Sequence, residues 1–239
     1  MRKQILVIVS ALFVAKGAFG IQTEFIPDGD CPQMVAHSYY SLCYVPEHRQ
    51  SSWVKYKLTL EMINGPAKRK NDFRADPKIE NPVTGSDFKG SGFDRGHLAP
   101  AADMKLNAEA MSESFFMTNM SPQRPGFNRS IWAHIERRMR NLVRQYGTAH
   151  VVTAGVLEEG LETIESGVTI PNYYYKVAYF PEAQIAKAFL IEHKRAPKGN
   201  YYADYLVTVD EVEEATGYDF FSDLPDKLES SVESKLFRD

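Results

Sequence analysis

Two stretches decide how this chain is interpreted: Asp94-Arg-Gly-His97-Leu-Ala-Pro100 and Asn128-Arg-Ser-Ile-Trp-Ala-His-Ile-Glu136-Arg-Arg-Met-Arg140. The first sets a histidine beside a glycine and an arginine, and the second combines an amide, a carboxylate and several guanidinium groups. A neutral histidine can act as a base near physiological pH. Amide and carboxylate oxygens bind hard cations, and guanidinium groups bind anions. Together these groups indicate a polar reaction centre.

The second stretch predicts a helix over residues 129–146, because apolar residues recur there at helical spacing and Gly147 can end the helix. Asn128, Glu136 and Arg140 then lie along one helix face. Two interpretations of Asn128 stay open, an N-cap and a metal ligand through its amide oxygen. Glu136 and Arg140 are likewise either a surface ion pair or groups that act on a bound cation and a phosphate.

The rest of the chain predicts an α+β fold. Alternating or apolar runs predict strands over residues 53–61, 93–99, 115–120, 149–155, 173–180, 183–193 and 205–209. We expect residues 21–52 to be irregular, 64–92 to form a long polar loop, and 108–114 to form a short helical segment. Residues 121–128 read as a turn-rich connector. The pattern Thr208-Val-Asp-Glu211 predicts a capping box at the start of a further helix, which Gly217 ends.

Composition is that of a globular protein, with 239 residues, 44% of them hydrophobic and 25% charged. Charge is segregated along the chain, whose formal net charge is −3. Residues 209–239 hold ten acidic side chains, whereas residues 121–145 hold a single acid, Glu136, beside six arginines. Those arginines are Arg124, Arg129, Arg137, Arg138, Arg140 and Arg144. A basic face on an acidic body is compatible either with brief binding of polyanions or with a solvated helix surface.

The N-terminus predicts a cleaved signal peptide over residues 1–20, followed by one domain over residues 21–239. Arg2 and Lys3 precede a short apolar run that ends at small residues, and this run is too short to span a bilayer. An uncleaved anchor or a buried helix is the alternative. Export fits a disulfide between the only cysteines, Cys31 and Cys43. The alternative is that both remain free thiols. We therefore expect a secreted or periplasmic protein without a membrane anchor after cleavage.

The order and spacing of several short motifs resemble one known family. Asp94-Arg-Gly-His97, then Asn119 with Pro122-Gln123, then Asn128-x7-Glu136-x3-Arg140 is similar to the DNA/RNA non-specific endonucleases. These belong to the ββα-metal (His-Me finger) nucleases and include secreted bacterial nucleases and mitochondrial endonuclease G. The resemblance starts near Tyr40 and ends near Gly217, so it covers most of the chain.

The resemblance implies a ββα-metal core within a mixed, mainly antiparallel sheet flanked by helices. It implies His97 as general base, Asn128 as the direct protein ligand of Mg²⁺, which Mn²⁺ can replace, and Glu136 as the residue that orients a metal-bound water. It also implies that Arg95 and Arg140 contact the phosphate and that Asn119 supports the histidine. The family also uses an arginine upstream of the central motif, for which Arg69 and Arg74 compete.

The function expected from these residues is Mg²⁺-dependent hydrolysis of phosphodiester bonds in DNA and RNA, with little sequence specificity. A non-catalytic nucleic-acid-binding module of the same fold is one alternative. A phosphodiesterase that acts on small nucleotides is another.

Overall fold

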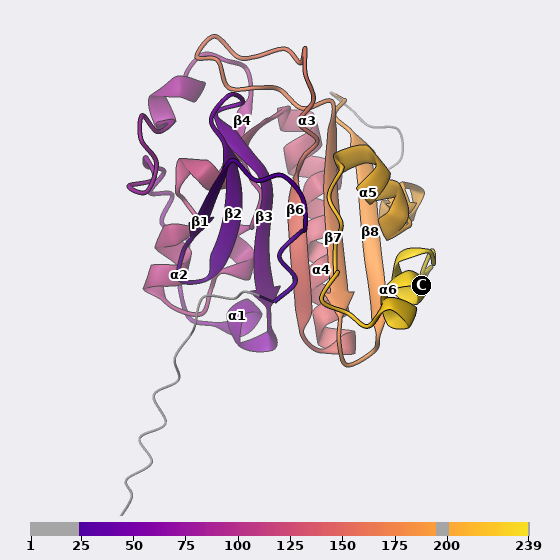
Figure 1. Cartoon of the computed structure of the whole chain (residues 1–239). Coiled ribbons are helices and arrows are strands. Elements are labelled where there is room, and N and C mark those ends of the chain that lie inside the picture. Colours follow the sequence, from indigo (N-terminus) through magenta and orange to yellow (C-terminus); the bar gives the residue numbers. More distant parts are fainter. Residues whose placement is uncertain (1–23, 195–200, 239) are drawn as a thin grey trace, which may run out of the picture.

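The central feature of the computed structural model, which describes residues 24–194 and 201–238, is a seven-stranded sheet in the order β1-β2-β3-β6-β7-β8-β9. Each neighbouring pair is antiparallel. The strands are β1 (Gln33–Ala36), β2 (Tyr40–Val45), β3 (Gln50–Leu58), β6 (Ala149–Gly155), β7 (Tyr173–Phe180), β8 (Ile185–Glu192) and β9 (Leu206–Val207). Figure 1 shows the sheet face-on, with the strands running vertically. The expected α+β class with a mainly antiparallel sheet is confirmed.

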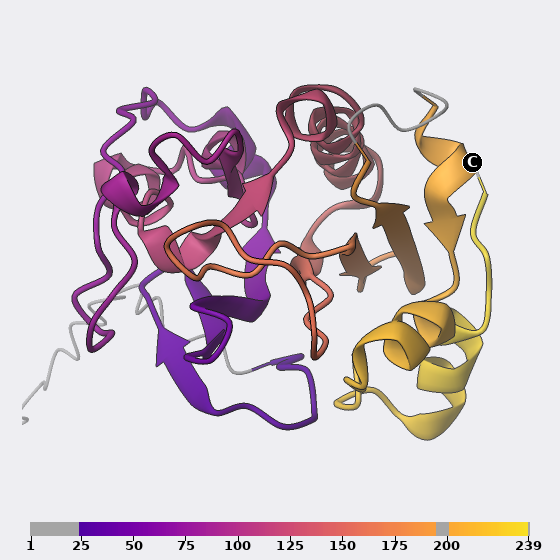
Figure 2. The same ribbon diagram turned by 90° about the horizontal axis from the view of Figure 1, so that it is seen from above.

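Helices cover both faces of this sheet (Figures 1 and 2). Helix α4 (Ala133–Tyr146) lies behind the sheet in Figure 1, whereas α5 (Val209–Thr216) and α6 (Asp226–Glu233) lie at its opposite face near β8. The apolar side of α4 is buried, including Ile135 and Met139. None of the helices in the described ranges is long and apolar enough to cross a membrane.

A second, two-stranded sheet carries the first decisive stretch. Strand β4 (Asp94–His97) pairs antiparallel with β5 (Met120–Gln123), and His97 lies opposite Met120. The chain then enters a helical segment made of α3 (Pro125–Phe127), a π-helical turn (Asn128–Trp132) and α4. Strand, strand and helix follow one another as the ββα arrangement requires.

Several boundaries differ from those expected. Residues 21–52 are not wholly irregular, because they contain β1, β2 and the start of β3; β2 is buried at nearly every position, so alternation is lost as a signal. Strand β3 ends at Leu58, because the Thr59 side chain caps the short helix α1 (Leu60–Asn64) by accepting a hydrogen bond from Met62 N. The expected strand over 115–120 is a 3₁₀ turn (Met117–Asn119), and the strand itself begins at Met120.

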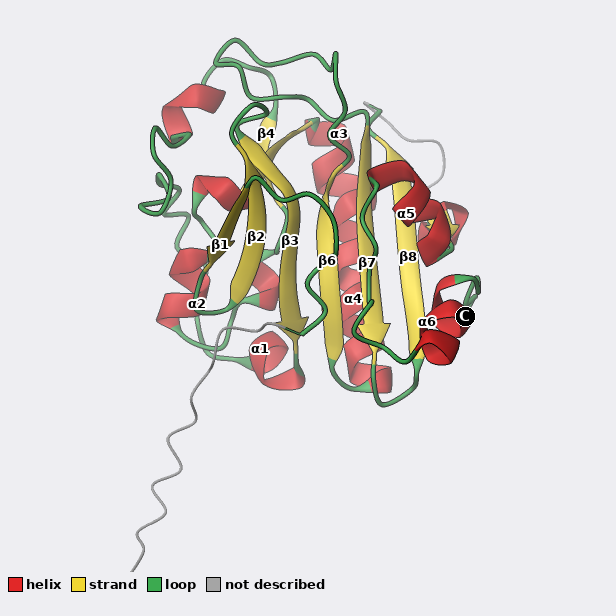
Figure 3. Cartoon of the chain, viewed as in Figure 1, coloured by secondary structure: helices red, strands yellow, loops and turns green. Residues whose placement is uncertain are grey.

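Other elements follow the sequence pattern closely, as the element colouring in Figure 3 shows. The expected helical segment is α2 (Ala108–Glu113), and the loop over 64–92 contains only one 3₁₀ turn (Gly85–Phe88) among its described residues. Thr208 and Glu211 form the predicted capping box, and Gly217 ends α5 with a positive φ of 72°. The short helix α6 was not expected from the sequence.

The N-terminal arm is held by the expected disulfide between Cys31 and Cys43, whose Cα atoms lie 5.6 Å apart. Residues 1–23, and with them the expected signal peptide, lie outside the described residues.

Replacing both cysteines with serine is expected to lower the midpoint of thermal unfolding by roughly 6–12 °C. The entropy model gives a stabilisation of about 3 kcal/mol for a loop of this length. The initial rate of the folded protein at 25 °C should change less than twofold. Calorimetry and a rate assay on the double variant check this, and an unchanged midpoint would show that the bridge adds no stability.

Candidate active site

His97 lies at the end of β4 with its imidazole between two aromatic rings. The ring centroids of Phe115 and Phe73 are 4.9 and 5.7 Å away, both edge-to-face. Nε2 of His97 is buried and has no hydrogen-bond partner among the described residues. Burial, together with the guanidinium groups of Arg69 and Arg95, lowers the pKa of His97 to about 3. The imidazole is therefore neutral at physiological pH, with one nitrogen available to a ligand.

Gly96 is required by a close approach, not by a sharp turn. A Cβ at this position would lie 2.2 Å from the buried side chain of Gln123 on β5, so a larger residue would displace that side chain. The glycine thereby leaves room for Gln123 beside β4, next to His97 in the chain.

Asn119 supports the segment after His97 through the backbone. Its Oδ1 accepts a hydrogen bond from Ala99 N at 2.8 Å, and its Nδ2 donates to the carbonyl oxygens of Ala99 and Ser114, each at 2.9 Å. Both ends of the amide are thus engaged. The expected support of the histidine by Asn119 therefore does not act through a hydrogen bond to the imidazole, because this buried amide is bonded to the main chain.

Asn128 does not cap a helix, because its backbone is itself helical, with φ −56° and ψ −46°. Its Nδ2 donates to Asp94 Oδ2 at 2.9 Å, and Asp94 also forms an ion pair with Arg129. Asp94 therefore orients the amide and leaves Oδ1 as the atom that can face a cation. The N-cap interpretation is excluded, and the geometry fits an oxygen ligand for a hard metal ion.

Glu136 belongs to a largely buried charged group on the sheet side of α4. Burial raises the pKa of Glu136 to about 7, against the opposing influence of Lys176. Lys176 is itself fully buried, and its Nζ lies 3.4 Å from the carbonyl oxygen of Leu98 and 4.9 Å from the centroid of the Trp132 ring. Burial disfavours the ionised form of this carboxylate, and a bound cation would stabilise it. Glu136 therefore also fits a metal site.

Arg140 is not in a surface ion pair with Glu136. Its Nη1 lies 2.7 Å from Oδ1 of the buried Asp103, and Tyr56 donates to the other oxygen of Asp103 at 2.9 Å. The guanidinium is largely buried, at 15% exposure. Asp103 fixes the direction of Arg140 and partly neutralises its charge. Sequence patterns gave no signal for Asp103, Tyr56 or Lys176, because these residues come from separate elements.

Arg69 and Arg74 are separated by the structure. Arg69 lies over the Phe115 ring with its Cζ 5.0 Å from the centroid, and its charge acts on the pKa of both His97 and Glu136. Arg74 instead donates to Asp72 and to Ser112 O. Arg69 is therefore the upstream arginine that faces the candidate site.

Arg95 is exposed and lies beside the same aromatic pair, with its Cζ 4.0 Å from the centroid of the Phe73 ring. The site thus combines a neutral histidine, an amide oxygen and a carboxylate with the three guanidinium groups of Arg69, Arg95 and Arg140. This set matches the needs of phosphodiester hydrolysis with a divalent cation.

Comparison with known proteins agrees with this chemistry. The family model described as DNA/RNA non-specific endonuclease matches residues 21–227. The chain belongs to this family. The DNA/RNA non-specific endonucleases similar to it include a nuclease of Nostoc sp., 31% identical over 90% of this chain and 81% of that protein. Human mitochondrial endonuclease G is 30% identical, over 77% of this chain and 68% of that protein.

The fold of this non-specific endonuclease is also found in a solved structure, the crystal structure of the EndoG/EndoGI complex. The TM-score is 0.75 at 26% sequence identity, with 84% of this chain and 89% of that chain covered. The matched relatives carry nuclease names, so the chain is a nuclease, and a binding module without turnover is the less supported alternative. Nucleic acid is its class of substrate.

Proposed function

We propose that this nuclease is a Mg²⁺-dependent endonuclease that cuts DNA and RNA with little sequence preference and leaves 5′-phosphate ends. The observation that carries the proposal is the neutral His97 imidazole, with a free Nε2, between the arginines of the same site. His97 Nε2 would take a proton from the attacking water, whose oxygen forms the new bond to phosphorus as the bond to the 3′-oxygen breaks.

Asn128 Oδ1 would bind the metal ion directly, and the Glu136 carboxylate would hold it through a water molecule that it orients, for which their hard oxygen atoms are suited. When bound, the ion supplies charge stabilisation for the phosphate and the leaving oxygen, and Mn²⁺ should replace Mg²⁺. Asp94 orients Asn128 through its hydrogen bond to Nδ2. Lys176 and Arg140 favour the ionised form of Glu136, because each of them lowers its pKa.

Arg69, Arg95 and Arg140 would bind the phosphate whose charge grows as the reaction proceeds. Arg140 is held in one direction by Asp103, so its contribution should appear in turnover more than in affinity. The exposed arginines Arg137 and Arg144 lie on α4 beside the site and would add non-specific attraction for the nucleic-acid backbone.

A nicking assay on supercoiled plasmid tests the proposed function. Cleavage of DNA and of a long RNA is expected with Mg²⁺ or Mn²⁺ and should stop in excess chelator. A dinucleotide should be cut at least about tenfold more slowly per bond, because it cannot reach the outer arginines. Faster turnover of the dinucleotide than of the plasmid would instead establish a small-nucleotide phosphodiesterase.

Arg69→Ala is expected to lower kcat/KM for plasmid about tenfold, the effect of losing one charged hydrogen bond to phosphate. Arg74→Ala is the matched control, since its guanidinium is engaged with Asp72 and Ser112 O. It should lower the midpoint of unfolding and leave the rate of the folded enzyme within about twofold. The reverse ranking of the two rates would assign the upstream role to Arg74.

We further propose that residues 21–239 form a single nuclease domain that is exported to the periplasm or the medium after cleavage of residues 1–20. The Cys31–Cys43 bond supports an oxidising compartment. Several relatives are mitochondrial by name, including endonuclease G and the nuclease of Saccharomyces cerevisiae. Intact mass of the exported protein would locate the cleavage site, and an uncleaved N-terminus would refute export by this route.

A further inference from the structure

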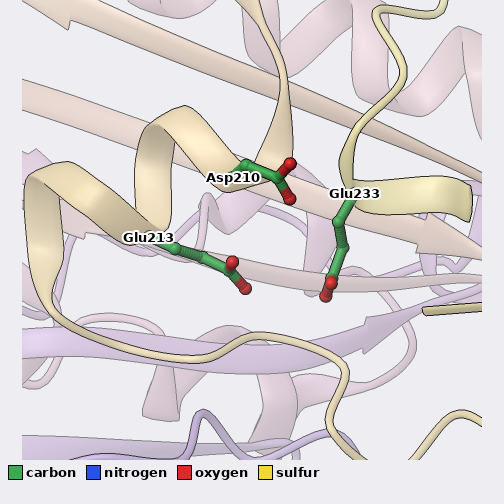
Figure 4. Close-up of side chains that lie close together, drawn as sticks. All are labelled: Asp210, Glu213 and Glu233. Carbon is green, nitrogen blue, oxygen red and sulfur yellow. The ribbon is translucent and has the colours of Figure 1, made fainter. Parts of the chain in front are cut away.

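Helices α5 and α6 bring acidic side chains together on the face of the sheet opposite α4. Three carboxylate oxygens, one each from Asp210, Glu213 and Glu233, lie within 4.8 Å of one another, and so do three from Asp219, Glu229 and Glu233. Figure 4 shows the carboxylates of the first set turned toward a common space. We call the five residues the α5–α6 carboxylate cluster; Glu233 belongs to both sets.

Glu233 is the member that most needs a partner. It is 6% exposed, and its Oε1 has no hydrogen-bond partner among the described residues. Burial, and after it the charges of the neighbouring carboxylates, led by Glu213, raise the pKa of Glu233 to about 8. Glu213 itself is fixed, because its Oε1 accepts a hydrogen bond from Phe220 N at 2.9 Å. A buried carboxylate among other carboxylates is destabilising unless a cation or a proton neutralises it.

We propose that the α5–α6 carboxylate cluster binds one Ca²⁺ ion, separate from the catalytic metal and without a role in the reaction. Within each set, three oxygen atoms up to 4.8 Å apart fit around one ion with bonds of about 2.3–2.6 Å, the range for Ca²⁺, and Glu233 is the ligand common to both sets. Ca²⁺ also accepts irregular coordination, which suits carboxylates from two short helices, whereas Mg²⁺ demands near-octahedral geometry. Asp210 and Asp219 are exposed, so water can complete the shell.

The expected effect of the ion is mechanical. It ties α6 to α5, and both helices pack against β8 at the edge region of the main sheet. The ion would give a role to five of the ten acidic residues in 209–239, because their charges favour a divalent cation there. Calcium would thus stabilise the C-terminal region of the fold while magnesium serves catalysis.

Calcium binding is best measured on the Asn128→Ala protein, in which the catalytic site is impaired. Isothermal titration with CaCl₂ up to about 10 mM, above the range of extracellular calcium sites, is expected to show one ion per chain. Adding Glu233→Gln should weaken this binding at least tenfold, and Asp210→Asn should weaken it less. Glu214→Gln is the matched control, because Glu214 is an exposed acid on α5 outside the cluster. It should bind calcium as the parent does.

Thermal unfolding is the second measurement. The direction in which the midpoint shifts, with calcium and in chelator, distinguishes neutralisation of Glu233 by calcium from neutralisation by a proton. Calcium at a hundredfold excess over its Kd should raise the midpoint of the otherwise unmodified protein by about 5 °C, and at the same concentration it should raise that of Glu233→Gln by at most about half as much. In chelator at pH 8.5, Glu233→Gln should be at least as stable as the parent, because a buried charge has been removed.

Plasmid nicking with Mg²⁺ should be unchanged in this variant. Calcium binding that survives Glu233→Gln, or no binding at all by Asn128→Ala, would overturn the proposal and leave protonation of Glu233 as the source of neutralisation.

Discussion

His97→Ala is expected to lower the rate of plasmid nicking by about 10²–10⁴-fold, the usual contribution of a positioned general base. Binding of DNA should survive, because Arg69, Arg95 and Arg140 all remain. The measurement is a nicking time course at saturating Mg²⁺, together with fluorescence anisotropy of a labelled duplex. His48→Ala is the matched control, since His48 bonds to Thr169 and does not lie among the site residues.

Because the pKa of His97 is depressed, we expect its protonation to have no effect on the cleavage rate between pH 5 and 8. A histidine with a folded-state pKa of about 3 is already neutral at pH 5, so its protonation does not limit the rate between pH 5 and 8. The signals of its ring in an NMR titration should therefore stay constant over that range. A ring that titrates near pH 6.5 would show that the pKa of His97 is not depressed, whereas a His97→Ala variant that cuts within a few-fold of the parent would remove His97 from the role of base.

Asn128→Ala is expected to raise the concentration of Mg²⁺ needed for half-maximal activity by about 10²-fold, the upper end of the range for residues that support a metal. At low Mg²⁺ the activity should fall accordingly, and it should recover in part as Mg²⁺ is raised, because water can occupy the missing position. Asn141→Ala on the same helix, whose side chain accepts from Arg144, is the control.

Asp94→Ala separates ligation from orientation at the same position. It leaves both atoms of the Asn128 amide in place but removes the acceptor of Nδ2. We expect a shift of about tenfold in the Mg²⁺ requirement, smaller than that of Asn128→Ala. Full activity of the parent protein in chelator would refute a metal-dependent mechanism, and equal Mg²⁺ requirements for Asn128→Ala and the parent would exclude this amide as a ligand.

The strand pair and the helix that carry the candidate site could be predicted from the sequence because they follow one another closely along the chain. His97, Asn128 and Glu136 lie within 40 residues and are carried by one strand pair and one helix, so order and spacing sufficed. The π-helical turn at Asn128 could not be predicted from local helix propensity. It is accompanied by a hydrogen bond from the Asn128 side chain to Asp94, which lies 34 residues earlier in the chain.

Residues that support the site from a distance were not predictable. Lys176, Asp103 and Tyr56 come from β7, a 3₁₀ turn and β3, and they meet only when the main sheet packs against α4. The hydrogen-bond partners of Asn119 could not be predicted for the same reason, since they are main-chain atoms of residues 99 and 114. Hydrophobic periodicity places a helix on a sheet, but it does not say which polar groups the contact brings together.

Opening of the loop over residues 64–92 would abolish activity without unfolding the main sheet. The loop brings Arg69 and Phe73 to His97, and because it contributes no strand to either sheet, it is held by separate contacts such as those of Asp76 with His37 and Thr118. Local opening of such a segment needs less free energy than global unfolding. Heating should therefore silence the enzyme while the sheet remains intact, and cooling should restore cleavage without any refolding of the core.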